Sequence, residues 1–417
     1  MELSAYDNLL TLLRNAVLGQ SAPLPYAPCW QQLMQQARMH GVEPLVYDAA
    51  LRLPDNQMPD KRLATLMKQV CLYQMQQQAL WQPRIIAAVD ALRNAGIEPV
   101  LLKGFGLAEL YPKPYLRSWG DADIWVGIAN YHAGCKALRE AFPEAIHHDE
   151  EYEELKHYGI VFPDGNAIEL HRVAMDFPSR AEDRYWQTLE VPAMQQAVCA
   201  AKTGRGNVLP ALNNICVPSQ PFNILFVFLH AWEHFCTSGM PLKQIWDLAL
   251  LVRRDYLPLS DHDKQCYDAY LSAHLHRFRL QQAWQLVAYA VWYVSGICMP
   301  LTQPKSDSAV QQQFVQRMLA EGHKGGTAVQ QQFVQRVLAE GQCRTKEYML
   351  GGADRYDERE RVKQLPVWQR KFLTLQGRFS HARFLYQFSP AYARHVLWQN
   401  ILKGLRRTIR RERMIDY

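Results

Sequence analysis

The sequence at residues 100–126 reads VLLKGFGLAELYPKPYLRSWGDADIWV, and this stretch decides the fold. Apolar runs at its two ends predict two short strands, and an Asp-Ala-Asp triplet opens the second of them. Side chains alternate between the faces of a strand, so Asp121 and Asp123 should share one face while Ala122 and Ile124 point into the core. Two neighbouring carboxylates repel each other, and a hard divalent cation held by oxygen ligands relieves that repulsion. The pair therefore predicts a Mg²⁺ or Mn²⁺ site at a sheet end.

The segment between the two strands predicts a turn that suits a phosphate. Gly104 and Gly106 allow a tight turn after the first strand, and residues 107–111 are expected to form a short helix. Backbone N–H groups at a helix start favour phosphate groups, and Lys103 would add a positive charge. An Asp-x-Asp pair alone is common in solvated loops, but the order strand, glycine turn, helix and Asp-x-Asp strand is more specific. We therefore expect Lys103 and Gly104 to contact a nucleotide.

A third carboxylate is expected on a later strand. Residues 157–162 and 167–171 are two short apolar-rich runs, and the Pro-Asp-Gly-Asn sequence between them is typical of a hairpin turn. In the second run Ile168 and Leu170 share one face, whereas Glu169 and His171 share the other. Glu169 is therefore the candidate third metal ligand. The alternative is an ordinary polar residue on a half-exposed hairpin.

These motifs resemble a bacterial group, the uncharacterised nucleotidyltransferases, within the superfamily that includes DNA polymerase beta. Members of that group carry Leu-Lys-Gly, Tyr-Pro, an arginine shortly before Asp-x-Asp, and later an acid followed by Leu-His. The corresponding residues here are Leu102-Lys103-Gly104, Tyr111-Pro112, Arg117, Asp121-Ala122-Asp123 and Glu169-Leu170-His171. One departure is Phe105, which follows Gly104 where the wider superfamily has glycine or serine. The resemblance covers about residues 30–254.

The resemblance implies an α+β fold that is mostly helical, with a small mixed sheet between N- and C-terminal helical segments. It implies an enzyme that moves a nucleoside monophosphate from a nucleoside triphosphate such as ATP to a hydroxyl acceptor. Two metal ions would be held by Asp121, Asp123 and Glu169. Lys103 and Arg117 would contact the triphosphate, and Asp123 would help to deprotonate the acceptor. A sugar, another small molecule, a tRNA or a protein stays open as the acceptor.

A second informative stretch lies at residues 221–254. His230 and His234 are four residues apart and so share a helix face, and Lys243 and Asp247 fall on the next helix. The same bacterial group has a comparable histidine helix followed by a basic residue and an aspartate. This implies that these four residues, together with His171, line or brace the nucleotide pocket. Two alternatives stay open: ordinary hydrogen bonds between helices, and a transition-metal hydrolase site built from His230, His234 and Asp247.

Helical spacing of apolar residues predicts helices before and after the sheet. The expected domains are a helical segment at 1–95, the nucleotidyltransferase core at 96–180, a helical domain that completes the pocket at 181–300, a duplicated helical insertion at 301–345 and a helical region with a basic tail at 346–417. Residues 61–95 form one long helical pattern that Pro83 should kink or split, while residues 176–218 carry no clear pattern. The uncharged stretch 280–301 is expected to be a buried helix rather than a membrane span, since glutamines occupy its start.

Two further features fall late in the chain. The sequence AVQQQFVQRMLAEG at residues 309–322 recurs at 328–341 with one change, Met318 against Val337. Two copies are too few for a solenoid and indicate a tandem duplication in a helical hairpin or a surface insertion. The tail reads as a basic amphipathic helix that either docks on its own domain or reaches an anionic membrane or a nucleic acid. The second interpretation underlies the main alternative function, a non-catalytic nucleotide-binding or scaffold protein.

The composition is that of an ordinary globular protein with room for two or three domains. The chain has 417 residues, of which 48% are hydrophobic and 21% charged, and its net charge is a mild +6. Nine cysteines are scattered without a Cys-x-x-Cys pair, which argues against a cysteine zinc site or a disulfide framework. Because the start of the chain shows no signal-peptide pattern, the expected location is the reducing cytoplasm.

Overall fold

The computed structural model describes residues 6–118, 121–147, 157–164, 166–177, 179–204, 208–237, 240–302, 383, 385–386 and 390–398. Within these residues the fold is α+β and mostly helical, which confirms the predicted fold class. The duplicated segment at 309–341 and the basic tail from residue 399 lie outside the described residues.

The described residues form one mixed sheet of seven strands in the order β3-β4-β5-β2-β1-β7-β6. The strands are β1 (Val100–Leu101), β2 (Asp121–Trp125), β3 (Ile146–His147), β4 (His157–Val161), β5 (Ala167–His171), β6 (Val208–Leu209) and β7 (Ile215–Cys216). β2 runs antiparallel to β1 and parallel to β5. β4 and β5 form the antiparallel hairpin that the Pro-Asp-Gly-Asn turn predicts. β6 and β7 extend the sheet past residue 180, and the expected domain limits stay a prediction.

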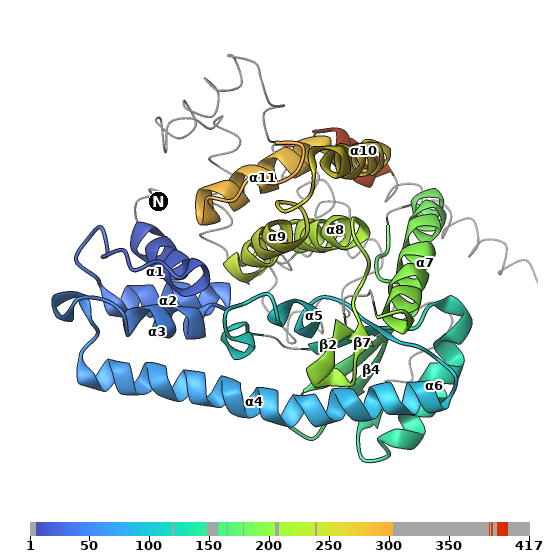
Figure 1. Ribbon diagram of the computed structural model, residues 1–417, viewed down its shortest axis with the longest axis horizontal. Helices are drawn as coiled ribbons and strands as arrows, with labels where there is room; N and C mark the ends of the chain where they lie inside the picture. The colour runs from blue at the N-terminus through green and yellow to red at the C-terminus, as the bar shows by residue number, and fades with distance from the viewer. Residues whose placement is uncertain are drawn as a thin grey trace, which may run out of the picture.

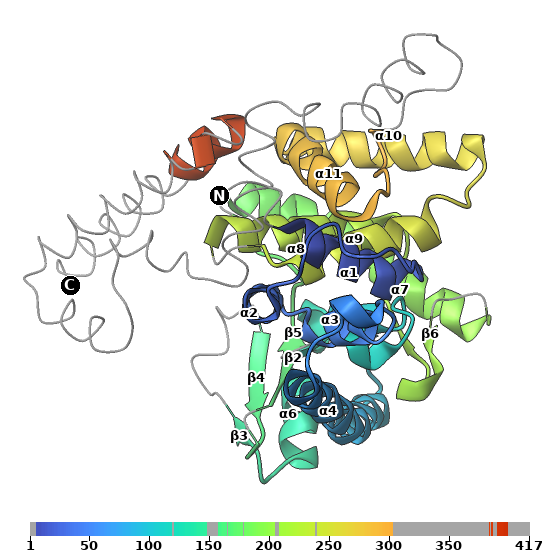
Figure 2. The same ribbon diagram turned by 90° about the vertical axis from the view of Figure 1, so that its left-hand side faces the viewer.

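Two helices cover one face of the sheet. Figures 1 and 2 show α4 (Lys61–Asn94) passing along the sheet with α6 (Tyr131–Ala141) beside it. The apolar side chains of both helices share a core with Ala122 and Ile124 of β2 and with the apolar residues of β5. Because strand side chains alternate, Asp121 and Asp123 are left on the opposite face, as the sequence predicts.

Pro83 does not split the long helix, which leaves the kink as the remaining one of the two expected effects. α4 runs without interruption from Lys61 to Asn94 with Pro83 inside it. A proline there removes the hydrogen bond to the carbonyl of Ala79. Trp81 and Ile85, on either side of Pro83, are both buried in the core beneath the sheet. Tertiary packing therefore outweighs the local cost of the proline.

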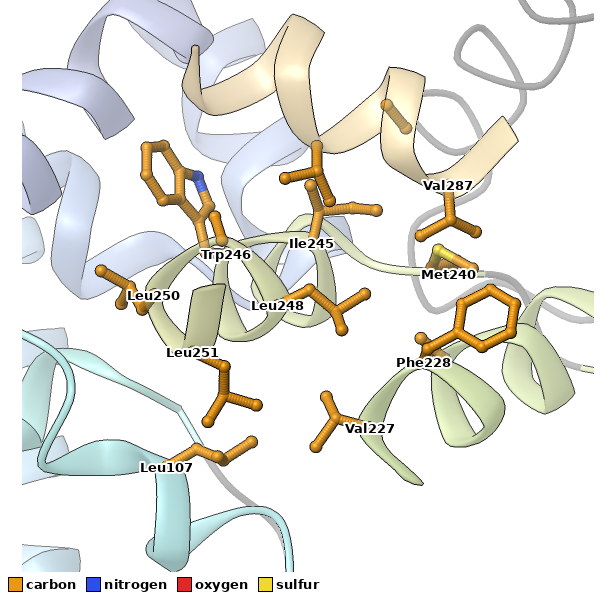
Figure 3. Packing of buried hydrophobic residues seen from close by; sticks show 14 of the residues in the cluster. Leu107, Val227, Phe228, Met240, Ile245, Trp246, Leu248, Leu250, Leu251 and Val287 are labelled. Atoms are coloured by element: carbon orange, nitrogen blue, oxygen red, sulfur yellow. The ribbon is translucent and has the colours of Figure 1, made fainter. Parts of the chain in front are cut away.

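Most of the remaining helices build a second core over the other face of the sheet. They are α1 (Asp7–Leu18), α2 (Trp30–His40), α3 (Glu43–Ala50), α7 (Arg180–Lys202), α8 (Phe222–Thr237) and α9 (Leu242–Asp255). α9 is central and is buried along most of its length. Figure 3 shows Leu251 of α9 pointing toward Leu107, which follows the glycine turn, with Val227 of α8 nearby. The segment after the glycine turn and the helices above this face of the sheet therefore pack against each other through α9.

α7 lies in the segment for which the sequence indicated no element. The hydroxyl of Ser179 accepts a hydrogen bond from the Glu182 backbone N–H at 3.2 Å and donates to the Glu182 carboxylate at 2.9 Å. The first of these bonds makes Ser179 the N-cap residue of α7, and a Ser-x-x-Glu pattern marks such a helix start in a sequence. The start of α7 was therefore visible in the sequence and was missed.

α10 (Asp261–Arg277) and α11 (Gln281–Ser295) complete the helical layer. α11 occupies most of the uncharged stretch, and its apolar residues join this second core, which confirms the expected buried helix. Among the described helices, none combines the length and the apolar character needed to cross a membrane.

Candidate active site

Three carboxylates meet on the face of the central strands that is opposite α4 and α6. The parallel register of β2 and β5 sets Asp123 directly beside Glu169, and Asp121 lies one pleat away on the same face. Oxygen atoms of Asp121, Asp123 and Glu169 all lie within 4.8 Å of one another. Asp123 is fully buried, whereas the other two are partly exposed. The structure thus brings together the three acids that the sequence singled out.

Asp123 is held from both sides by the side chains of Lys103 and His171. Nζ of Lys103 donates a hydrogen bond to Oδ2 of Asp123 at 2.8 Å. Nε2 of His171 lies 2.9 Å from Oδ1 of Asp123 and 3.4 Å from Oε2 of Glu169. Lys103 therefore offsets part of the negative charge that the three acids concentrate here. Burial acts to lower the pKa of His171, but its contacts with Asp123 and Glu169 raise it overall, so they favour the imidazolium form, which would offset more of that charge.

The surroundings of the two aspartates drive their pKa values apart. Burial acts to raise the pKa of Asp123, but Lys103 and His171 outweigh burial and hold it well below its usual range. Burial and the neighbouring charge of Asp123 raise the pKa of Asp121, against the opposing effect of Lys103. For Lys103, burial lowers the pKa, but the charges of Asp123 and Asp121 raise it overall. The site therefore carries negative charge that a further cation would stabilise.

The glycine turn directly follows Lys103, whose side chain contacts Asp123. Gly104 has φ +67°, a conformation that a residue with a side chain rarely adopts. A Cβ atom at Gly106 would lie 3.2 Å from the carbonyl oxygen of Leu101, so this position also favours glycine. The helix that follows, α5 (Phe105–Ala108), begins two residues earlier and is shorter than expected at 107–111. The reason is that Gly104 itself starts the helix as its N-cap residue.

Arg117 makes a buried two-pronged ion pair with Asp247 of α9. Its Nε and Nη2 donate to the two carboxylate oxygens at 2.8 Å and 2.7 Å. The Tyr111 hydroxyl donates to the same carboxylate at 2.9 Å. Burial acts to lower the pKa of Arg117, but Asp247 raises it overall. These contacts tie the segment before β2 to α9, so the predicted triphosphate contact of Arg117 would have to coexist with this ion pair.

Lys243 lies near this ion pair, and its backbone carbonyl accepts a hydrogen bond from the Tyr111 hydroxyl at 3.2 Å. Its side-chain ammonium makes no hydrogen bond or ion pair with any residue that the structure describes. A Cβ atom added at Gly41 would lie 3.1 Å from Cδ of Lys243, so Gly41 leaves room for its chain. Burial and the positive charge of Arg117 lower the pKa of Lys243 to about 8, against the opposing charges of Asp247 and Asp121. A cation in such a setting is suited to an anionic ligand.

The two histidines of α8 lie side by side, as their spacing predicts. The ring centroids of His230 and His234 are 4.5 Å apart with the rings nearly perpendicular. They do not form, with Asp247, a group of metal-ligating atoms within 4.8 Å among the described residues. The carboxylate of Asp247 is instead engaged by Arg117 and Tyr111. Their predicted place in the nucleotide pocket stays a prediction.

Two residues at the site were missed by sequence reasoning. His157 of β4 pairs with His171 across the hairpin, and its Nε2 lies 3.5 Å from Oε1 of Glu169. Period-two alternation along the first strand of the hairpin would have placed it on the acid-bearing face. Glu190 of α7 accepts hydrogen bonds from the indole of Trp125 at 2.6 Å and from the backbone of Ala174 at 2.9 Å. It thereby joins the ends of β2 and β5, but it lies in the segment without a clear pattern.

The comparison with protein families agrees with this arrangement. The sequence profile of a family described as "Uncharacterised nucleotidyltransferase" matches residues 27–292, which include the whole sheet, the three acids and α8 to α10. Neither the curated proteins nor the solved structures contain a significant match to the chain. Since the matched segment spans well over half of the sequence, the chain belongs to the uncharacterised nucleotidyltransferase family.

Proposed function

We propose that the protein is a Mg²⁺-dependent nucleotidyltransferase that moves a nucleoside monophosphate from a nucleoside triphosphate to a hydroxyl acceptor. The observation that carries the proposal is the gathering of Asp121, Asp123 and Glu169 from two adjacent parallel strands, with their oxygens within 4.8 Å of one another. Family membership supports the reaction class. The nucleotide, the acceptor and the metal are parts of the proposal.

The donor atoms fit a hard divalent cation. All three groups offer carboxylate oxygens, the ligands that Mg²⁺ and Mn²⁺ prefer, and two of them are partly exposed to solvent. Bound there, a divalent cation would neutralise charge on the phosphates and lower the pKa of an acceptor hydroxyl. Asp123 is buried and is oriented by Lys103 and His171, so it is the most precisely held of the three.

The cationic residues around the acids supply the phosphate contacts in this proposal. Lys103 balances the charge of Asp123, and once a metal ion shares that role its ammonium group is available for a phosphate. Lys243 provides a second positive charge, which interacts electrostatically with both the ion pair of Arg117 and Asp121. Arg117 keeps its ion pair with Asp247 and positions the segment that precedes β2.

The scaffold alternative is less well supported by the site. A fully buried carboxylate beside two others costs free energy, and a protein that only binds a partner through a basic tail does not require it. That tail lies outside the described residues.

We place the protein in the cytoplasm because the cysteines that the structure describes are all free thiols.

Calorimetric titration with ATP, GTP, CTP and UTP, with and without Mg²⁺, tests the proposal. We expect Mg²⁺-dependent binding of one triphosphate to the wild type and no such binding to the double variant Asp121→Asn/Asp123→Asn. A matched control is Asp261→Asn/Asp263→Asn, which removes another Asp-x-Asp pair from an exposed helix start. Equal binding by the wild type and the active-site variant would refute the metal assignment, as would binding that is indifferent to Mg²⁺.

A further inference from the structure

The hairpin places two imidazoles on either side of one of the three carboxylates. In the antiparallel register of β4 and β5, His157 lies directly opposite His171. Glu169 lies two residues before His171 on the same face, and its own cross-strand partner is Gly159, which has no side chain. Nothing in the proposed Mg²⁺ chemistry requires a histidine at position 157. The three side chains nevertheless converge.

The distances within this group match the spacing around a tetrahedral metal ion. Nε2 of His157 lies 3.5 Å from Oε1 of Glu169, and Nε2 of His171 lies 3.4 Å from Oε2 of the same residue. One ligand atom from each of the three residues lies within 4.8 Å of the others. Tetrahedral Zn²⁺, with bonds of about 2.0–2.2 Å, keeps neighbouring ligand atoms about 3.3–3.6 Å apart. Little rearrangement is therefore needed to bind such an ion.

The donor chemistry differs from that of the three acids. Imidazole nitrogen suits Zn²⁺, Co²⁺ and similar transition-metal ions, whereas carboxylates alone suit Mg²⁺ and Mn²⁺. Nδ1 of His171 lies 3.3 Å from the carbonyl oxygen of Val173. A metal-binding histidine commonly donates its other ring N–H to such a carbonyl, which directs the remaining nitrogen toward the ion. Here that remaining nitrogen is Nε2, the atom that faces the carboxylates.

The three side chains of this group differ in their exposure to solvent. The side chain of His157 is 40% exposed and that of Glu169 is 25% exposed, whereas that of His171 is only 4% exposed. An ion can therefore enter past His157 and meet a rigid, buried inner ligand. Three protein ligands with a solvent-facing fourth position are the pattern of an open zinc site rather than a closed structural one.

From this geometry we propose that His157, Glu169 and His171 form a second metal site, one that prefers a transition-metal ion such as Zn²⁺ over Mg²⁺. The site shares Glu169 with the proposed Mg²⁺ site. It is also linked to that site through His171, because a metal ion on Nε2 would release Oδ1 of Asp123 from its present contact. Binding at the histidine site does not depend on nucleotidyl transfer and extends beyond the proposed function.

The test uses Co²⁺ as a spectroscopic probe on the untagged, metal-stripped protein. Titration followed by visible absorption should show one more tight Co²⁺ equivalent for the wild type than for His157→Ala, or an affinity at least ~10-fold higher. Zn²⁺ should displace this Co²⁺, and a large excess of Mg²⁺ should not. His132→Ala, which removes an exposed imidazole from α6, should behave as the wild type. Identical Co²⁺ titrations for the wild type and His157→Ala would overturn the proposal, and so would displacement by Mg²⁺.

Two additional measurements separate this proposal from the proposed function. Zn²⁺ should raise the thermal midpoint of the wild type and raise it much less for His157→Ala, since only a ligand that binds the folded state stabilises it. An equal rise in both proteins would contradict the site. Asp121→Asn should keep the Co²⁺ spectrum while losing Mg²⁺-dependent nucleotide binding. Loss of the Co²⁺ spectrum in that variant would show that the ion binds among the three acids instead.

Discussion

Nζ of Lys103 lies 2.8 Å from Oδ2 of Asp123, and this ion pair connects the glycine turn to the carboxylate cluster. Asp123 is fully buried, and the side chain of Lys103 is only 18% exposed. A buried charge that loses its partner is strongly destabilising, whereas the intact pair is not in itself a large gain. The lysine is therefore needed most when no metal ion is bound.

Lys103→Met should destabilise the metal-free protein by about 3 kcal/mol, because the variant leaves Asp123 with less opposing charge. Added Mg²⁺ should recover a large part of that loss, since the cation takes over the same role. Urea unfolding with EDTA and with Mg²⁺ measures both effects. Lys136→Met, at a side chain that is 79% exposed, provides the control and should change little. A loss that does not depend on Mg²⁺ would contradict this account.

The ion pair between Arg117 and Asp247 yields a second prediction. Arg117→Met and Asp247→Leu should each cost about 3–5 kcal/mol, because each leaves one buried charge without its partner. The double variant should cost much less than the sum of the two single changes. Urea unfolding of all four proteins completes the double-mutant cycle. Additive losses would show that the two side chains do not stabilise each other.

The same double variant tests the role of Arg117 in nucleotide binding. If Arg117 acts by positioning the segment before β2, nucleotide affinity should change by no more than a few-fold in the folded double variant. A loss of binding without a loss of folding would instead support the direct triphosphate contact that the family resemblance implies. Calorimetry on the double variant and the wild type distinguishes the two roles.

How much of the site the sequence predicts depends on the range of each interaction. Strand alternation is local, so the shared face of Asp121 and Asp123 and that of Glu169 and His171 could be read directly. The parallel pairing of β2 with β5 joins residues far apart in the chain, and no local pattern predicts it. The family resemblance implied only that the three acids act together on the metal ions. The pairing of Arg117 with Asp247 is of the same kind, since 130 residues separate them.

Local patterns are least informative where packing outweighs local preference. Pro83 lies within a helix whose neighbouring residues are buried beneath the sheet, and that packing keeps the helix whole. α7 also contains a proline, Pro192, which disguised its helical pattern although Ser179 and Glu182 marked its start. Local rules of this kind describe the free energy by which a residue such as proline disfavours a helix. Packing in the core, which joins residues far apart in the chain, decides whether that loss is offset.

Pro83 itself offers a stability prediction. A proline inside a helix is about 3 kcal/mol less favourable than alanine, and Pro83 is exposed, so its ring adds little to the core. Pro83→Ala should therefore raise the free energy of unfolding by about 1–3 kcal/mol, which urea unfolding can measure. Pro192→Ala in α7 is a parallel case and should shift stability in the same direction. An unchanged or lowered stability for both variants would show that the prolines fit their helices without strain.

Lys243 makes folding stability depend on pH in a defined window. Its pKa in the folded protein is about 8, below the value of about 10.4 for an unfolded chain. Between these two values the unfolded state binds more protons than the folded state, so this residue makes stability rise as pH increases across the window. Lys243→Met should flatten that rise, and Lys136→Met should not. Urea unfolding between pH 7 and pH 10 compares the three proteins.

The same titration should govern nucleotide binding. Below pH 8 the ammonium form of Lys243 predominates and can attract a triphosphate, whereas above pH 8 the free amine predominates and that attraction is lost. Affinity for the nucleotide should therefore fall as pH rises through 8, and binding near pH 8 should take up protons because the bound anion favours the charged lysine. Calorimetry in buffers of different ionisation enthalpy measures this uptake. Lys243→Met should bind more weakly at pH 7 and lose both the uptake and the pH dependence, while Lys136→Met should keep them. Proton uptake that persists in Lys243→Met would assign the titrating group elsewhere.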